Sequence, residues 1–95
     1  MKIDSNSLSV EHRKDAKRFE IQIEEYTAVL DYFINEKTIT FTHTGVPRAL
    51  EGQGIGARIV RVGLDYARAQ GYKVVPLCSF VDAYIRRHEE YGDLV

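Results

Sequence analysis

Three glycines within five positions, Gly52, Gly54 and Gly56, lie directly before an amphipathic helical pattern in the segment EGQGIGARIV. Glycines packed this closely cost backbone entropy on folding, so they mark a place where the backbone bends sharply or approaches a ligand. Between a strand and the first turn of a helix, they leave backbone N–H groups unpaired at the positive end of the helix dipole. This arrangement predicts a binding site for phosphate or pyrophosphate.

Two common phosphate-binding loops are excluded by the residues around the glycines. A nucleotide P-loop needs Lys and then Ser or Thr after its last glycine, whereas Ala57 and Arg58 follow Gly56 here. A dinucleotide-binding loop needs the spacing G-x-G-x-x-G early in a doubly wound sheet. In this chain the third glycine comes one position too soon, and four predicted strands precede the loop.

Cys78 and His43 are the candidate reactive side chains. Cys78 ends the apolar run YKVVPLC just before a predicted helix, where the helix dipole lowers the pKa of a thiol. His43 ends the alternating run KTITFTHT, in phase with Ile39 and Phe41. If the two runs are neighbouring parallel strands, the thiol and the imidazole lie at the same sheet edge and can form a reactive pair. A buried cysteine used as a small hydrophobe and a satisfied boundary histidine are the alternative interpretations.

The elements that must position these residues change period at the glycine loop. Before it, apolar and polar residues alternate in strands predicted over residues 8–13, 18–24, 27–36 and 37–44, and short polar joints indicate an antiparallel meander. After it, helical spacing predicts a helix from Ile55 to a C-cap at Gly71. The buried face of that helix is predicted to carry Ile55, Ile59, Val60, Gly63, Leu64 and Ala67.

The last part of the chain predicts a strand and a helix. Residues 72–78 form a short apolar run that predicts a strand buried on both faces. Ser79 with Asp82 matches a capping box that opens a helix over residues 80–91. The predicted fold is α+β, with the meander followed by strand, helix, strand, helix. Residues 37–44 and 72–78 form its one parallel pair.

Length and composition bound the broad class. The chain has 95 residues, of which 44% are hydrophobic and 28% charged, which predicts one globular domain over residues 1–95. Thirteen basic and fourteen acidic residues give a net charge of -1, so nothing favours nucleic acid or a membrane surface as partner. With a single cysteine, no signal-like or membrane-spanning run and no metal-ligand spacing, we expect a cytoplasmic protein, a monomer or weak dimer, without a bound metal.

The segment EGQGIGARIV resembles the pyrophosphate loop Q/R-x-x-G-x-G/A of the GCN5-related N-acetyltransferases. Together with THT, VPLCSF and the ending YIRRHEEYGDLV, residues 10–95 resemble the minimal, single-domain members of that family. The resemblance implies a parallel strand pair splayed around acetyl-CoA as co-substrate, and acetyl transfer to an amine. It implies contacts to acetyl-CoA from Thr44, Val46, Glu51, Gly52, Gln53, Gly54, Ile55, Gly56 and Arg58.

The resemblance also implies chemical roles in the active site. It places Cys78 there, as an acetyl-cysteine nucleophile or a thiolate base, with His43 as a base or orienting group. Tyr84 matches a tyrosine that protonates the departing CoA thiolate, although a tyrosine on an amphipathic helix more often packs. Arg87 and His88 could contact phosphates of the cofactor, but capping of the helix end is the favoured interpretation.

The chain departs from the family pattern at two positions, and the second of them, Gly45, keeps another function open. Glu51 stands where the loop motif has Gln or Arg, and Gly45 stands where an acid often serves as general base. The alternative is therefore a CoA-binding sensor or interaction module without turnover. The joint KDAK leaves no room for the helices that wall the acceptor site in larger relatives, so the resemblance implies an open acceptor side suited to a protein or peptide amine.

Overall fold

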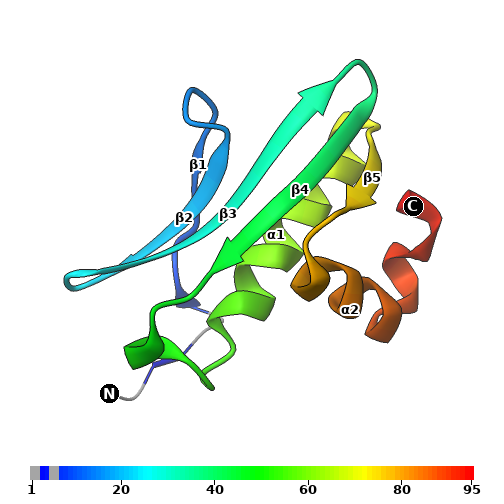
Figure 1. Ribbon diagram of the computed structural model, residues 1–95. Coiled ribbons are helices and arrows are strands. Elements are labelled where there is room, and N and C mark those ends of the chain that lie inside the picture. Colours follow the sequence, from blue (N-terminus) through cyan, green and yellow to red (C-terminus); the bar gives the residue numbers. More distant parts are fainter. Residues whose placement is uncertain (1–2, 5–6) are drawn as a thin grey trace.

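The computed structural model describes residues 3–4 and 7–95. Five strands form one sheet in chain order: β1 (Glu11–Arg13), β2 (Arg18–Ile23), β3 (Tyr26–Asn35), β4 (Thr38–Gly45) and β5 (Lys73–Pro76) (Figure 1). The first four strands pair antiparallel, and β5 pairs parallel with β4. The predicted meander and its single parallel pair are confirmed.

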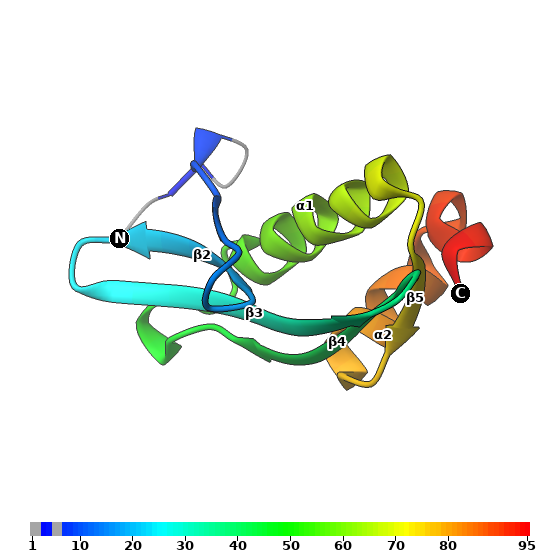
Figure 2. The ribbon, with the colours of Figure 1, turned by 90° about the horizontal axis from the view of Figure 1, so that it is seen from above.

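Helices cover one face and one end of the sheet. α1 (Ile55–Gln70) lies along one face, whereas α2 (Ser79–Arg87) and the 3-10 helix η3 (Glu89–Leu94) gather at the β5 end (Figure 2). A short 3-10 helix, η2 (Arg48–Leu50), lies between β4 and the glycine loop. No helix in the described part of the chain is long and apolar enough to cross a membrane.

The buried stripe of α1 is the one that its sequence predicts. Every residue named for that stripe is buried, and the helix ends at Gly71, whose φ of 75° suits a C-cap glycine. Gly63 lets the helix lie close to the sheet, because a Cβ there would come within 2.7 Å of Leu30 Cδ2 and 3.1 Å of Phe41 Cε1. The described residues share one hydrophobic core between α1 and the sheet.

Two predictions for the last part of the chain are wrong. β5 is buried on one face only, since Val74 is 3% exposed and Val75 is 42% exposed. β5 is the edge strand of the sheet, and only the face that carries Val74 belongs to the hydrophobic core. The N-cap of α2 is Cys78 and not Ser79, and no side chain makes a capping hydrogen bond there.

The last helix also ends earlier than predicted, and a second helical turn follows. His88 ends α2, and its Nδ1 donates to the Tyr84 carbonyl at 2.8 Å, so the favoured capping interpretation is confirmed for this residue. η3 then docks on α1: the Tyr91 hydroxyl donates to Asp65 Oδ1 at 2.7 Å, and Arg68 binds both carboxylate oxygens of Asp93 at 2.9 and 3.0 Å. The ending YGDLV therefore anchors the C-terminus.

A β-bulge in β4 inverts the alternation of its side chains. Tyr32 pairs with Phe41 whereas Asp31 pairs with His43, so Thr42 is one extra residue in β4. Residues directly opposite on antiparallel strands share a face. Thr44, opposite buried Leu30, therefore points to the core side, and His43 points away and is exposed. The prediction that His43 lies in phase with Ile39 and Phe41 is wrong for this reason.

An aromatic cluster of His12, Phe19 and Tyr32 lies at the start of the sheet, and it makes the free energy of unfolding depend on pH. The His12 ring stacks on Phe19 at 4.1 Å between centroids, and Nε2 hydrogen-bonds the Tyr32 hydroxyl at 2.6 Å. Burial, and then the charge of Lys14, lower the pKa of His12 from its ordinary 6.5. The folded state therefore binds this proton less readily than the unfolded state does. Its contribution to stability is complete above about pH 6.5 and falls as the pH drops toward the lowered pKa.

We expect His12→Gln to flatten this part of the pH profile, because glutamine keeps a hydrogen-bonding group but does not titrate. Urea unfolding of both proteins at a series of pH values from 7.5 to about 4.5 measures the difference in the free energy of unfolding. The wild type should lose more stability across this range than the variant. Parallel curves for the two proteins would show that His12 does not titrate in this environment.

Candidate functional site

β4 and β5 separate at their C-terminal ends. Their pairing ends at Phe41 and Pro76, whereas β4 continues to Gly45. Pro76 has no N–H with which to extend the ladder, and the last tie is the Cys78 N–H, which donates to the Phe41 carbonyl at 3.0 Å. Residues 42–45 of β4 have no partner strand on that side in the described chain. A gap therefore opens between two parallel strand ends.

Cys78 and Thr44 meet at this gap. Cys78 Sγ lies 3.4 Å from Thr44 Oγ1, and Cys78 is the N-cap of α2. Burial of the thiol opposes its ionisation, but hydrogen bonds from the Thr44 hydroxyl and from the backbone around Phe80 and Val81 outweigh it. The pKa of Cys78 is therefore lowered. The structure thus joins a thiol of lowered pKa to a hydroxyl that can hydrogen-bond to it.

The predicted pairing of Cys78 with His43 is not formed. Neighbouring residues of a strand point to opposite faces. Because Thr44 points toward Cys78, His43 points to the outer face of the sheet. The imidazole instead lies over Gly45, where a Cβ would come within 3.1 Å of His43 Nε2. His43 therefore borders the space that an acidic side chain at position 45 would enter.

The glycine loop forms a shallow hollow at the N-terminus of α1. Gly52 and Gly54 have φ values of 78° and 79°, which favour glycine, and Gly54 is the N-cap of α1 without any side-chain cap. The hollow has a volume of about 210 Å³, and we call it the loop hollow. Its lining residues are Val46, Leu50, Glu51, Gly52, Gly54, Ile55, Gly56, Ala57 and Phe80.

The donor groups at this hollow fit an anion. The first intrahelical bond of α1 runs from the Arg58 N–H to the Gly54 carbonyl at 3.0 Å, so the preceding amides of the first turn have no partner within the helix. No acidic residue lies in this turn. A Cβ at Gly56 would come within 2.7 Å of Phe80 Cζ, so glycine at this position lets the ring lie against the first turn of α1. The residues present suit a phosphate or pyrophosphate group.

The structure brings six of the nine residues expected to contact acetyl-CoA to the loop hollow. Thr44 lies instead at the gap with Cys78. Gln53 does not line the hollow, and Arg58 turns away from it. Ala57 faces the hollow, and one step along a helix rotates the next side chain by about 100°. The Arg58 side chain therefore points elsewhere, and one of its nitrogens donates to the Leu8 carbonyl at 3.4 Å. Phosphate contact by Arg58 is not supported by this position. Phe80 lines the hollow, and no pattern in the sequence indicated it.

Tyr84 lies further along α2 than the Cys78–Thr44 contact. Its ring stacks on His88 at 3.9 Å between centroids, and the residue is 9% exposed. Burial raises its pKa, while the charge of Arg61 acts in the opposite direction. These contacts are those of a packed side chain, and no contact in the structure links the phenol to the thiol. The role of Tyr84 as an acid stays a prediction.

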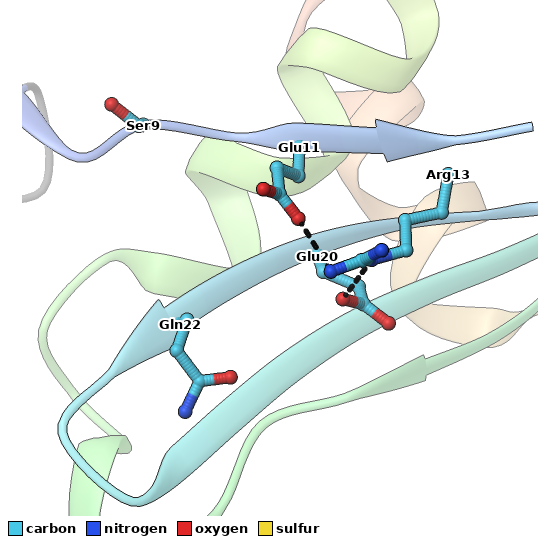
Figure 3. A pocket seen from close by; sticks show the side chains of 5 residues that line it. All are labelled: Ser9, Glu11, Arg13, Glu20 and Gln22. Atoms are coloured by element: carbon cyan, nitrogen blue, oxygen red, sulfur yellow. Dashed lines mark hydrogen bonds and ion pairs between the residues drawn. The ribbon is translucent and has the colours of Figure 1, made fainter.

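A further hollow of about 260 Å³ is lined by Ser9 and by residues of β1 and β2, and Arg13 pairs there with two carboxylates (Figure 3). Arg13 contacts Glu11 and Glu20 at 2.9 Å each. This hollow holds none of the residues predicted for the site. Among the described residues, no group of three or more His, Cys, Asp and Glu side chains is arranged to hold a metal ion.

Comparisons with known proteins, by sequence and by structure, find acetyltransferase-like proteins. Residues 18–94 match the family model described as GCN5-related N-acetyl-transferase. The chain is 28% identical to Protein NATD1 of Xenopus tropicalis, over 88% of this chain and 80% of that protein. It is 25% identical to Protein NATD1 of Homo sapiens, over 85% of this chain and 74% of that protein.

A solved structure agrees with these sequence matches. An NMR structure of a GCN5-like candidate N-acetyltransferase from Staphylococcus aureus is similar with a TM-score of 0.72 and 27% identity. The similarity covers 92% of this chain and 86% of that chain.

The Cys78–Thr44 contact leads to a test of thiol reactivity. We expect iodoacetamide to alkylate Cys78 with a pH midpoint below that of an ordinary thiol near 8.5. Thr44→Val should move this midpoint upward, since it removes the hydroxyl that stabilises the thiolate and nearly keeps the volume. Thr38→Val, the same change at the start of the same strand, is the matched control and should leave the midpoint unchanged. Equal midpoints for all three proteins would exclude a role for Thr44.

Proposed function

This chain belongs to the GCN5-related N-acetyltransferase family, and we propose that it binds acetyl-CoA and transfers the acetyl group to an amine. One observation carries the proposal. The gap between the ends of β4 and β5 adjoins the loop hollow, because Val46 and Phe80, two positions beyond Thr44 and Cys78, line it. This adjacency supports a path along which one ligand reaches both the helix N-terminus and the Cys78 thiol.

The chain's own groups supply the binding contacts in this proposal. The free amides at the first turn of α1 take the pyrophosphate. The unpaired edge of β4 over residues 42–45 offers backbone donors and acceptors to the amide-bearing arm of the substrate, in the manner of an added strand. The thioester then reaches the gap beside Cys78. Glu51 also lines the loop hollow, and its carboxylate weakens the attraction for an anion there.

We propose that Cys78 carries the acetyl group between the two substrates. Its thiolate attacks the thioester carbonyl, the bond from that carbon to the CoA sulfur breaks, and CoA leaves as a thiolate that takes up a proton. The acceptor amine then attacks the acetyl-cysteine, gives up a proton, and releases the Cys78 thiolate. His43 is proposed as the base for that proton; because it lies on the outer face of β4 and does not contact the thiol, it serves an amine that approaches from that face. Direct attack of the amine on the thioester is the alternative route.

The proposed acceptor is an amine on a protein or peptide. A turn over residues 14–17 joins β1 to β2, with no helix between the strands. The outer face of the sheet leaves Phe33 44% and Val75 42% exposed, so a large acceptor meets no wall on that side. The second candidate function is a CoA-binding sensor without turnover. It is favoured by Gly45, which provides no carboxylate base on β4.

Binding is tested by thermal unfolding with CoA and acetyl-CoA. A ligand at about a hundred times its Kd should stabilise the fold by about 2.7 kcal/mol. We expect Gly56→Val to abolish this shift, because the added side chain runs into the Phe80 ring and fills the loop hollow. Ala69→Val introduces the same side chain at an exposed position near the other end of α1 and should keep the shift. An unchanged shift in Gly56→Val would place the ligand elsewhere.

Turnover is tested by the release of free CoA thiol with a panel of amines and peptides. We expect Cys78→Ser to lose transfer far more than binding, since a nucleophile acts mainly on the transition state. His43→Gln should lower the rate by about 10²–10⁴-fold if it is the base. Acetyl-CoA alone should leave a base-labile acetyl adduct in the intact mass of the wild type.

The outcomes separate the three possibilities. Full turnover in Cys78→Ser would favour direct transfer and reduce Cys78 to a packing residue. Binding of acetyl-CoA without CoA release beyond background for any amine would favour the sensor.

A further inference from the structure

A hollow of about 170 Å³ lies where the β1–β2 turn meets β3 and α1, and we call it the tyrosine hollow. Its lining residues are Lys14, Lys17, Tyr32, Ile34 and Tyr66. Tyr66 lies eleven residues beyond the start of α1 at Ile55, which is about 16 Å along the helix axis. The tyrosine hollow shares no lining residue with the loop hollow and contains neither Cys78 nor Thr44. It is therefore separate from the candidate site described above.

The inner wall of the tyrosine hollow is aromatic and held in place by contacts among its rings. Tyr32 is buried, and its hydroxyl lies 2.6 Å from His12 Nε2. The Tyr66 ring meets the His12 ring edge-on, at 4.5 Å between centroids. Ile34 is exposed and adds aliphatic surface to the wall. The hollow thus offers a preformed apolar surface to the body of a small ligand.

Two lysines of the β1–β2 turn give the tyrosine hollow a positive charge. None of its lining residues is acidic, and neither Lys14 nor Lys17 forms an ion pair with any residue that the structure describes. On either side of the turn, by contrast, the Nε atoms of Arg13 and Arg18 lie 2.9 and 3.0 Å from carboxylate oxygens. Burial, and then the charge of Lys14, lower the pKa of His12, so this ammonium group lies on the side of the turn that faces the rings. The turn therefore presents two cations without a counter-charge to the hollow.

These walls and charges together limit the chemistry of a ligand. An apolar body packs against the tyrosine rings and Ile34, and an anionic head group accepts hydrogen bonds from the lysine ammonium groups. The volume lies below the roughly 300–1,000 Å³ of pockets that take drug-sized molecules, so the ligand is small.

We propose that the tyrosine hollow is a second ligand site, which binds a small organic anion: a carboxylate or phosphate on a single ring or a short branched chain. Lys14 and Lys17 hold the head group, and Tyr66 and Ile34 contact the body. This inference does not rest on the proposed acetyl transfer. The alternative role for the two lysines is that of solvated cations in an exposed turn.

The test is an NMR titration of the whole chain with phenyl phosphate, benzoate, benzyl alcohol and inorganic phosphate. Phenyl phosphate and benzoate should cause saturable shifts of the backbone amides of residues 14–17 and 66, with a Kd of about 1 mM for the better probe. Benzyl alcohol lacks the charge and inorganic phosphate lacks the ring, so each should bind about tenfold more weakly than that probe. The better of phenyl phosphate and benzoate identifies the preferred head group.

Matched variants test the two cations. Lys14→Gln and Lys17→Gln should each weaken binding of the better probe about three- to tenfold, because each removes one positive charge from the hollow. Lys37→Gln removes the same charge from the β3–β4 turn, outside the hollow, and should keep the wild-type affinity. All three lysines are exposed, so the variants should keep the fold.

Each of the other outcomes overturns the inference in its own way. Shifts confined to residues 52–57 would place the anions on the glycine loop, and the absence of saturable shifts would refute binding altogether. Equal affinity for benzyl alcohol and the charged probes would show a hollow without selectivity for anions. Equal affinity for inorganic phosphate and phenyl phosphate would show that the rings take no part. An equal loss of affinity in all three variants would show a general effect of positive charge.

Discussion

The extra residue in β4 decides where the chain's polar side chains point. Because Thr42 is accommodated as a bulge, the strand inverts its alternation just before it ends. Without the bulge, His43 would lie on the core side with Phe41, and Thr44 would face outward. With it, the hydroxyl of Thr44 meets the thiol of Cys78, and the imidazole is placed on the open face. The bulge thereby puts the Cys78 thiol and the His43 imidazole on opposite faces of β4.

The bulge and Pro76 act together to open the sheet. A bulge bends and twists its strand, and proline removes the donor that the next rung of the parallel ladder needs. The result is a sheet whose two parallel strands are paired over four residue pairs, from Thr38–Lys73 to Phe41–Pro76, and apart beyond them. The separated ends of β4 and β5 lie close to the N-terminus of α1. An extended ligand can lie between the strand ends with its anionic part at the helix. Membership in the acetyltransferase family is consistent with this use of the gap.

Two glycines on α1 allow other parts of the fold to pack closely against this helix. Gly63 lets the helix approach Leu30 and Phe41 closely, and Gly56 lets the Phe80 ring lie against the first turn of the helix. Each glycine inside a helix costs about 1 kcal/mol relative to alanine. That cost is offset at Gly63 by closer packing against the core. At Gly56 it is offset by the contact with the Phe80 ring. Gly56 and Phe80 both line the loop hollow, so the helix that completes the core also shapes the candidate site.

The sequence by itself determined the elements and the loop. Strict alternation, helical spacing and the glycines predicted the meander, the buried stripe of α1, the C-cap at Gly71 and the parallel pair, because each is a local pattern with a period set by backbone geometry. Only the tertiary structure decided the rest. The bulge at Thr42 depends on how β3 pairs with β4, so period counting carried His43 to the wrong face. The burial of β5 on one face depends on its position at the edge of the sheet. The orientation of Arg58 depends on the segment around Leu8, whose carbonyl it contacts. Phe80 at the loop hollow joins α2 to α1 across the fold. Contacts between distant segments leave no signature in local spacing, and the Cys78–Thr44 pair is one of them.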